Sequence, residues 1–207
     1  MPDICGYFQY RATDAVALTQ AIEQVKANLP PARQSLLHYY RLQLVYELAY
    51  LRMFCNWEEF LEQTFLRYLC GYECSAGPET PLLTFSSSIT RAENLVLAGH
   101  QFVLWHNPVT VIRRAQTCFR NSRHEQVIAS NLSRIESFSH IRHRIAHHNA
   151  DAKAKFDTAC MMLCGRRFPG SRPGAFLRDW VNLGATRRRW LDVIANELCN
   201  LAQQIVP

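Results

Sequence analysis

The chain has 207 residues, of which 48% are hydrophobic, and it carries a formal net charge of +6 with a sequence pI of about 9.0. This length fits one domain with a substantial core, and no apolar stretch reaches the roughly 18 to 20 residues that span a bilayer. The positive excess is almost all arginine, whose planar guanidinium hydrogen-bonds two phosphate oxygens at once, so a phosphate-bearing partner is favoured.

The first residues, Met1-Pro2-Asp3-Ile4, lack a basic segment followed by a long apolar run, so no signal peptide is expected. The expected location is the cytoplasm, where the eight cysteines would stay reduced.

Helical periodicity first predicts a helix over 14–28, with Thr13 as its N-cap and Pro30-Pro31 at its end. Spacings of three and four predict that its buried seam consists of Ala15, Leu18, Ile22, Val25 and Leu29.

A much longer helix is predicted over 32–69, roughly 55 Å at 1.5 Å per residue, a length typical of bundles and helical dimers. Its expected apolar stripe runs through Leu37, Tyr40, Leu44, Leu48, Leu51, Cys55, Leu61, Phe65 and Leu69.

The rest of the chain predicts further helices separated by loops rich in Pro, Gly and Ser, with no strand alternation. The fold class expected is therefore all-α, a helical bundle with one very long helix, in a single domain over 1–207. In chain order the elements are a loop at 71–88, helices at 91–102, 109–120, 123–146 and 150–163, a basic loop at 165–174, and a last helix at 186–205.

Four of the eight histidines fall within nine residues, at positions 140, 143, 147 and 148, with Arg142 and Arg144 among them. Cationic and titratable groups rarely crowd one helix end without a partner. The apolar stripe Ile128, Leu132, Ile135 and Phe138 continues onto Arg142, which predicts that this arginine faces inward and needs a compensating anion. A glutamate on the long helix and an RNA phosphate are both candidates.

Arg142 and His147 are five residues apart, about 140° around an unbroken α-helix. They can act together only if the helix ends or kinks between them, or if two copies of the chain meet. His143 and His147 are four residues apart and share one face.

The segment Ile141-Arg142-His143-Arg144-Ile145-Ala146-His147 resembles the signature of the HEPN superfamily, an arginine followed by a histidine after four to six intervening residues. The long helix, with Glu47-Leu48-Ala49-Tyr50 and Trp57-Glu58-Glu59-Phe60-Leu61, and the arginine-rich loop at 166–174 extend the similarity toward bacterial toxin and defence members.

The resemblance implies a HEPN-type bundle that acts as a metal-independent endoribonuclease, with no cofactor and with the motifs of two protomers lining one cleft. It assigns His147 as the acid/base group, Arg142 as the phosphate clamp and His143 as an assisting group. RNA and a second copy are the expected partners, and an antitoxin or defence-system protein is expected to restrain the activity. A non-catalytic HEPN-like RNA-binding or adaptor module, which also dimerises, is the alternative.

Other basic residues near the signature are candidates for RNA contact: Arg144, His148, Arg166, Arg167 and Arg172. Arg187-Arg188-Arg189, predicted to lie inside the last helix, would point in three directions, so one or two of them would reach a common ligand.

A zinc site is a further interpretation, because His140, His143 and His147 follow one another at helical spacing. No nearby acidic or cysteine ligand completes a persuasive set, so no metal is expected. The two C-x3-C pairs, Cys70/Cys74 and Cys160/Cys164, are better explained as core or incidental thiols.

Overall fold

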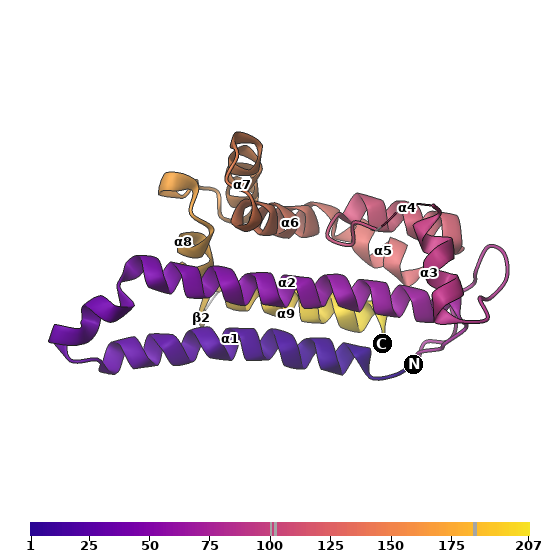
Figure 1. Ribbon diagram of the computed structural model, residues 1–207, viewed down its shortest axis with the longest axis horizontal. Helices are drawn as coiled ribbons and strands as arrows, with labels where there is room; N and C mark the ends of the chain where they lie inside the picture. Colours follow the sequence, from indigo (N-terminus) through magenta and orange to yellow (C-terminus); the bar gives the residue numbers. More distant parts are fainter. Residues whose placement is uncertain (100, 102, 184–185) are drawn as a thin grey trace. The chain divides into compact units, whose positions relative to one another are not determined.

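The structure, a computed structural model, describes residues 1–99, 101, 103–183 and 186–207. It is mostly helical, as expected, with one small antiparallel hairpin (Figure 1). The α-helices are α1 (Ile4–Asn28), α2 (Tyr39–Leu69), α3 (Ile89–Leu97), α4 (Pro108–Cys118), α5 (Arg123–Ser130), α6 (Leu132–Ala146), α7 (Ala150–Cys164), α8 (Pro173–Arg178) and α9 (Trp190–Ile205). The shorter elements are the 3₁₀ turns η1 (Pro31–Leu37) and η2 (Pro169–Ser171) and the strands β1 (Trp180–Leu183) and β2 (Thr186–Arg189).

The chain forms two compact units, and the helices α1, α2, α6 and α9 each contribute residues to both. Unit 1 comprises Met1–Gln9, Asn56–Glu136 and Leu198–Pro207, and unit 2 comprises Tyr10–Cys55 and Ser137–Glu197. A single domain over the whole chain stays a prediction. Within the described ranges, no helix combines the length and apolar character needed to cross a bilayer.

Aromatic side chains build the core of unit 1. The ring of Phe8 on α1 lies 5.6 Å from that of Trp57 and 5.5 Å from that of Phe60, both on α2. At the other end of α2 in this unit, the buried Tyr68 hydroxyl donates to the carbonyl of Ile205 on α9 at 2.8 Å. Large apolar rings thus join the segments of all three helices that belong to unit 1.

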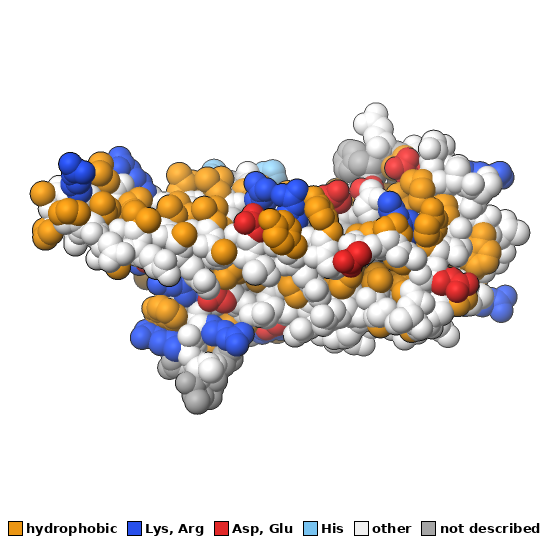
Figure 2. All heavy atoms as spheres, turned by 90° about the horizontal axis from the view of Figure 1, so that it is seen from below, with side chains coloured by type: hydrophobic (Ala, Val, Ile, Leu, Met, Phe, Trp, Pro, Cys, Tyr) orange, Lys and Arg blue, Asp and Glu red, His pale blue; other side chains and the backbone are white. Residues whose placement is uncertain are grey.

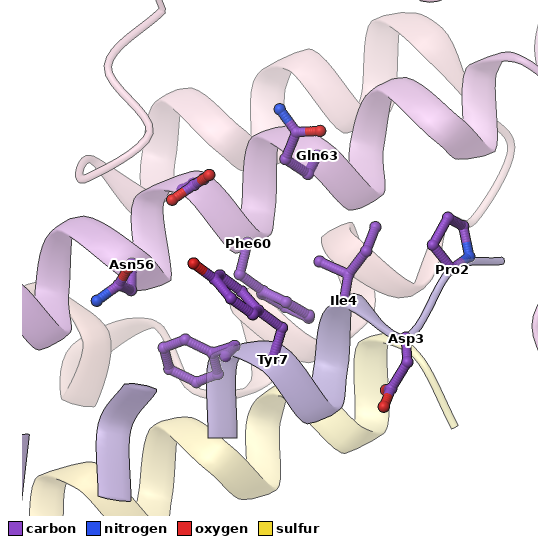
Figure 3. Close-up of a pocket in the computed structure, with 9 residues that line it drawn as sticks. Pro2, Asp3, Ile4, Tyr7, Asn56, Phe60 and Gln63 are labelled. Carbon is purple, nitrogen blue, oxygen red and sulfur yellow. The ribbon is translucent and has the colours of Figure 1, made fainter. Parts of the chain in front are cut away.

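Unit 1 also holds a cavity of about 220 Å³ between the start of α1 and α2 (Figure 3). Its lining is mixed: Ile4, Tyr7, Phe8 and Phe60 are apolar or aromatic, while Asn56, Glu59 and Gln63 come from successive turns of α2. Asp3, at the edge, accepts a hydrogen bond from the Gly6 amide at 2.8 Å and so caps α1.

In unit 2, α1 and α2 lie alongside each other (Figure 1), and Glu23 of α1 accepts a hydrogen bond from the Tyr46 hydroxyl of α2 at 3.2 Å. The Glu23 carboxylate also pairs with Arg178 at 2.6 Å and with Arg189 at 3.4 Å. Burial opposes ionisation of Glu23, but the hydrogen bonds and charges of the two arginines outweigh it and lower the pKa of this carboxyl. This cluster fixes α8 and the hairpin against α1 and α2.

Several expected boundaries were wrong. The first helix begins at Ile4 and not near Thr13, and residues 31–37 form a 3₁₀ turn before the long helix. The helix expected over 123–146 is two helices with a break at Asn131, and 186–189 is a strand, not the start of the last helix. The loop after Leu69, the Asn107 N-cap of α4 and the end of α6 at Ala146 are confirmed.

The two predicted seams were also partly wrong. On α1 the buried positions are Phe8, Ala12, Ala15 and Thr19, whereas Leu18 and Val25 are exposed. On the part of α2 in unit 2, Leu42, Tyr46, Ala49, Tyr50, Met53 and Phe54 are buried, and Tyr40, Leu44 and Leu48 of the expected stripe are more than half exposed.

Candidate functional site

The residues predicted to act on RNA all lie in unit 2, on the last turns of α6, on the turn after it and on the segment before α8. α7 leaves the end of α6 at a steep angle (Figure 1). The side chain of Asn149 caps α7 by accepting a hydrogen bond from the Ala152 amide at 2.8 Å. Two helix ends therefore meet at 147–149.

α6 runs without a break through the signature as far as Ala146, and His147 is the first residue beyond its end. The amide of His147 still donates to the carbonyl of His143 at 2.9 Å, so the expected kink between Arg142 and His147 does not occur. A continuous helix places these two residues about 140° apart, and a single chain does not bring them together. The buried line of α6 continues from Phe138 to Ile141, which leaves Arg142 half-buried with its Nε enclosed.

His143 and His147 do come together, on one face of the end of α6. Their ring centroids are 4.7 Å apart with an interplanar angle of 49°. His147 is exposed and His143 is half-buried. Burial and the neighbouring charge of His147 lower the pKa of His143, so its imidazole is biased toward the neutral form that accepts a proton.

Asp151 and Lys155 complete this cluster from α7. Asp151 Oδ2 lies 3.6 Å from His143 Nε2 and 2.7 Å from Lys155 Nζ, whose hydrogen bond lowers the pKa of the Asp151 carboxyl. Neither residue was predicted to act with the histidines. Asp151 and Lys155 lie four residues apart on one helix, so their pairing could have been predicted, but the contact of Asp151 with His143 crosses the turn at 147–149 and no helical spacing indicates it.

Arg144 connects the turn to the segment before α8. Its Nε donates to the Ser171 carbonyl at 3.2 Å and its Nη1 to the His147 carbonyl at 3.1 Å, with His148 Nδ1 at 3.4 Å. Ser171 is itself held by Asp157, which accepts from its hydroxyl at 2.8 Å. The guanidinium of Arg144 thus positions the exposed end of α6, and RNA contact by Arg144 or His148 stays a prediction.

The loop arginines have different surroundings. Arg166 pairs with Asp179, and its guanidinium lies over the ring of Phe168 at 4.8 Å. Arg172 lies over the ring of Tyr40 at 4.8 Å, while Arg167 is exposed. Arg166 and Arg172 are therefore held against the protein surface, and their side chains remain exposed to solvent.

No set of three or more His, Cys, Asp and Glu side chains is arranged to hold a metal ion in the part of the chain that the structure describes. His140, His143 and His147, all within the described residues, do not form such a set. The eight cysteines all lie within the described residues, and none forms a disulfide.

The geometry offers two imidazoles on one exposed helix end, surrounded by arginine and lysine. Two imidazoles can hold and release protons near neutral pH, and fixed cations attract phosphate. Searches with the chain against protein-family models, curated proteins and solved structures find no match.

Proposed function

We propose that the chain is a metal-independent endoribonuclease of the HEPN type. The observation that carries the proposal is the contact between the His143 and His147 rings, 4.7 Å apart at a basic, exposed helix end. RNA supplies its own nucleophile, so proton transfer and charge stabilisation are the only chemistry that the protein must provide.

In the proposed reaction, an imidazole removes the proton of a 2′-hydroxyl, and the oxygen attacks the adjacent phosphorus. The bond to the 5′ oxygen breaks, and this oxygen takes a proton from an imidazolium. The products are a 2′,3′-cyclic phosphate and a 5′-hydroxyl, and Arg142 would offset the charge that builds on the non-bridging oxygens. The lowered pKa of His143 suits the base, which leaves His147 to act as the acid.

Arg142 would enter the site from a second copy of the chain. The continuous α6 separates Arg142 from His147 within one chain, so a joint role requires two protomers. The apolar side chains Tyr40, Leu44 and Leu48 lie one helical turn apart on α2 and are 58%, 53% and 57% exposed, so they give a second copy a surface to cover.

A bacterial toxin or phage-defence setting in the cytoplasm, with a restraining partner, rests on the resemblance of the signature.

The test compares total RNA cleavage by the wild type, His147→Ala and Arg142→Lys, with and without a chelator. Loss of the acid/base group is expected to slow cleavage by about 10² to 10⁴-fold, with cyclic phosphate ends and no effect of chelator on the wild type. His106→Gln, in unit 1, is the matched control and should retain full activity. Circular dichroism checks that each variant is folded.

Mixing His147→Ala with Arg142→Lys tests whether two protomers share one site. If one site uses Arg142 from one protomer and His147 from the other, heterodimers restore part of the activity. Undiminished cleavage by His147→Ala would contradict the proposal, and RNA binding without cleavage by any form would favour the non-catalytic adaptor. Chelator-sensitive cleavage would instead indicate metal chemistry.

Asp151→Asn should move the acid limb of the pH–rate profile to lower pH. The negative charge of Asp151 raises the pKa of His143, so its removal makes the imidazole lose its proton at a lower pH. A base must be deprotonated to act, and the rate would therefore rise at lower pH than in the wild type. Profiles of kcat/KM on a short oligoribonucleotide measure the limb, and an unchanged limb would exclude His143 as the base.

A further inference from the structure

The hairpin β1–β2 places an exposed tryptophan among arginines. In its antiparallel register Trp180 lies opposite Arg189 and Val181 lies opposite Arg188. Because side chains alternate along a strand, Arg187 and Arg189 share the face of Trp180, and Arg188 lies on the other face. The guanidinium carbons of Arg187 and Arg189 lie 4.7 Å and 4.2 Å from the centre of the Trp180 ring.

Trp180 differs from the other three tryptophans in its exposure. It is 43% exposed, whereas Trp57, Trp105 and Trp190 are 0%, 7% and 5% exposed. The indole packs against the guanidinium groups of Arg187 and Arg189, and the part of it that stays exposed gives a planar ligand access to an aromatic surface.

The arginines of the hairpin have two distinct roles. Arg189 is turned inward, paired with Glu23 at 3.4 Å and donating to the Arg178 carbonyl at 2.5 Å, so it anchors the base of the hairpin. Arg187 and Arg188 are exposed, and Lys and Arg side chains gather around the hairpin at the lower left of Figure 2. Asp179, the nearest acid before β1, is already paired with Arg166. The exposed charge of the hairpin is therefore positive.

We infer that the hairpin binds single-stranded RNA, with a base stacked on Trp180 and phosphates held by Arg187 and Arg188. Stacking on an aromatic ring combined with adjacent cations is the recognition mode of single-stranded nucleic acid, since paired bases do not offer their faces. The choice of RNA rests on the proposed function. The proposed RNA contact thus includes the hairpin β1–β2 as well as the loop at 165–174.

Binding is best measured in a His147→Ala background, which keeps the RNA intact, with a labelled 12-nucleotide oligouridylate. RNA is expected to quench tryptophan fluorescence, because Trp180 is the exposed indole. Trp180→Leu should lose this quenching and weaken binding about tenfold, while Trp180→Phe, which keeps a ring, should retain most of the affinity. The double variant Arg187→Ala/Arg188→Ala should reduce the dependence of the binding constant on salt, because two phosphate contacts are lost. The slope of the logarithm of the binding constant against the logarithm of the salt concentration should become less steep by about 1.4.

Arg113→Ala/Arg120→Ala, two exposed arginines of unit 1, form the matched control and should leave the slope unchanged. Unaltered RNA affinity and salt slope in the hairpin variants would overturn the inference, as would a preference for duplex RNA or for anionic phosphatidylserine vesicles. A wild type that never cleaves RNA but binds it through Trp180 would defeat only the proposed function. Cleavage with unchanged affinity in Trp180→Leu would defeat only the inference.

Discussion

Replacing Gly174 with valine should lower the free energy of unfolding by about 2 to 4 kcal/mol. A Cβ at this position would lie 2.4 Å from the Gln43 carbonyl oxygen, a backbone atom of α2 that cannot turn aside. The Gly174 amide also donates to the Glu47 carboxylate at 2.9 Å, and a shift of α8 to relieve the clash would lengthen this bond. Urea denaturation followed by circular dichroism measures the loss.

Ala154→Val, on the exposed surface of α7, is the matched control for the Gly174 variant. It also adds bulk to a small helical residue, and its expected cost is well below 1 kcal/mol because nothing is displaced. A Gly174→Val protein as stable as this control would contradict the close approach of α8 to α2. Retained stability would also show that the contact with α2 does not require a glycine at the start of α8.

Acidification should destabilise the protein through His124, by about 1.4 kcal/mol for each pH unit between pH 6 and pH 4. Burial lowers the pKa of His124 to about 3. An unfolded histidine takes up a proton below about pH 6.5, so in this range the unfolded state binds more protons than the folded state. The contribution of neutral His124 to the free energy of unfolding is therefore complete above about pH 6.5 and is lost as the pH falls.

The packing of His124 explains why it stays neutral. Its ring contacts those of Phe65 and Tyr68 at 5.3 Å and 5.8 Å. The Thr64 hydroxyl donates to the Phe60 carbonyl at 2.7 Å, so His124 Nε2–H donates to Thr64 Oγ1 at 3.0 Å. A second ring proton, on Nδ1, would meet no acceptor among the described atoms.

His124→Phe removes this titration, so the free energy of unfolding of the variant should fall less steeply than that of the wild type as the pH is lowered. The slopes are compared, not the absolute stabilities, because phenylalanine also changes the packing. His106→Gln, another histidine of unit 1, should keep the steep slope. Equal slopes in the wild type and His124→Phe would place the His124 ring in contact with water.

The sequence predicted helix content well because Pro, Gly and capping residues act locally. Pro30-Pro31, Asn107 and Asn149 each mark a boundary through their own backbone or side chain. The buried faces were harder, since α2 is apolar on two sides. Leu44 and Leu48 fit the helical period as well as Leu42 and Tyr46 do, and only the contacts with the rest of unit 2 decide which pair is buried.

The hairpin escaped prediction because its strands have four residues each and because its arginines precede an amphipathic helix without interruption. At the candidate site, the shared face of His143 and His147 followed from their spacing of four and is confirmed by their ring contact. The bonds from Arg144 to Ser171 and from Gly174 to Glu47 join residues 27 and 127 positions apart. No local pattern indicates such pairs.

The continuity of α6 has a consequence for how the proposed nuclease would respond to its own abundance. If each chain carries Arg142 and His147 on separate faces, an isolated chain is half of a site and cannot cut RNA. Cleavage at low concentration would then rise with the square of the amount of protein, because pairs of chains form by mass action. A cell would tolerate trace synthesis and be exposed to damage only above a threshold, which the dissociation constant of the dimer would set.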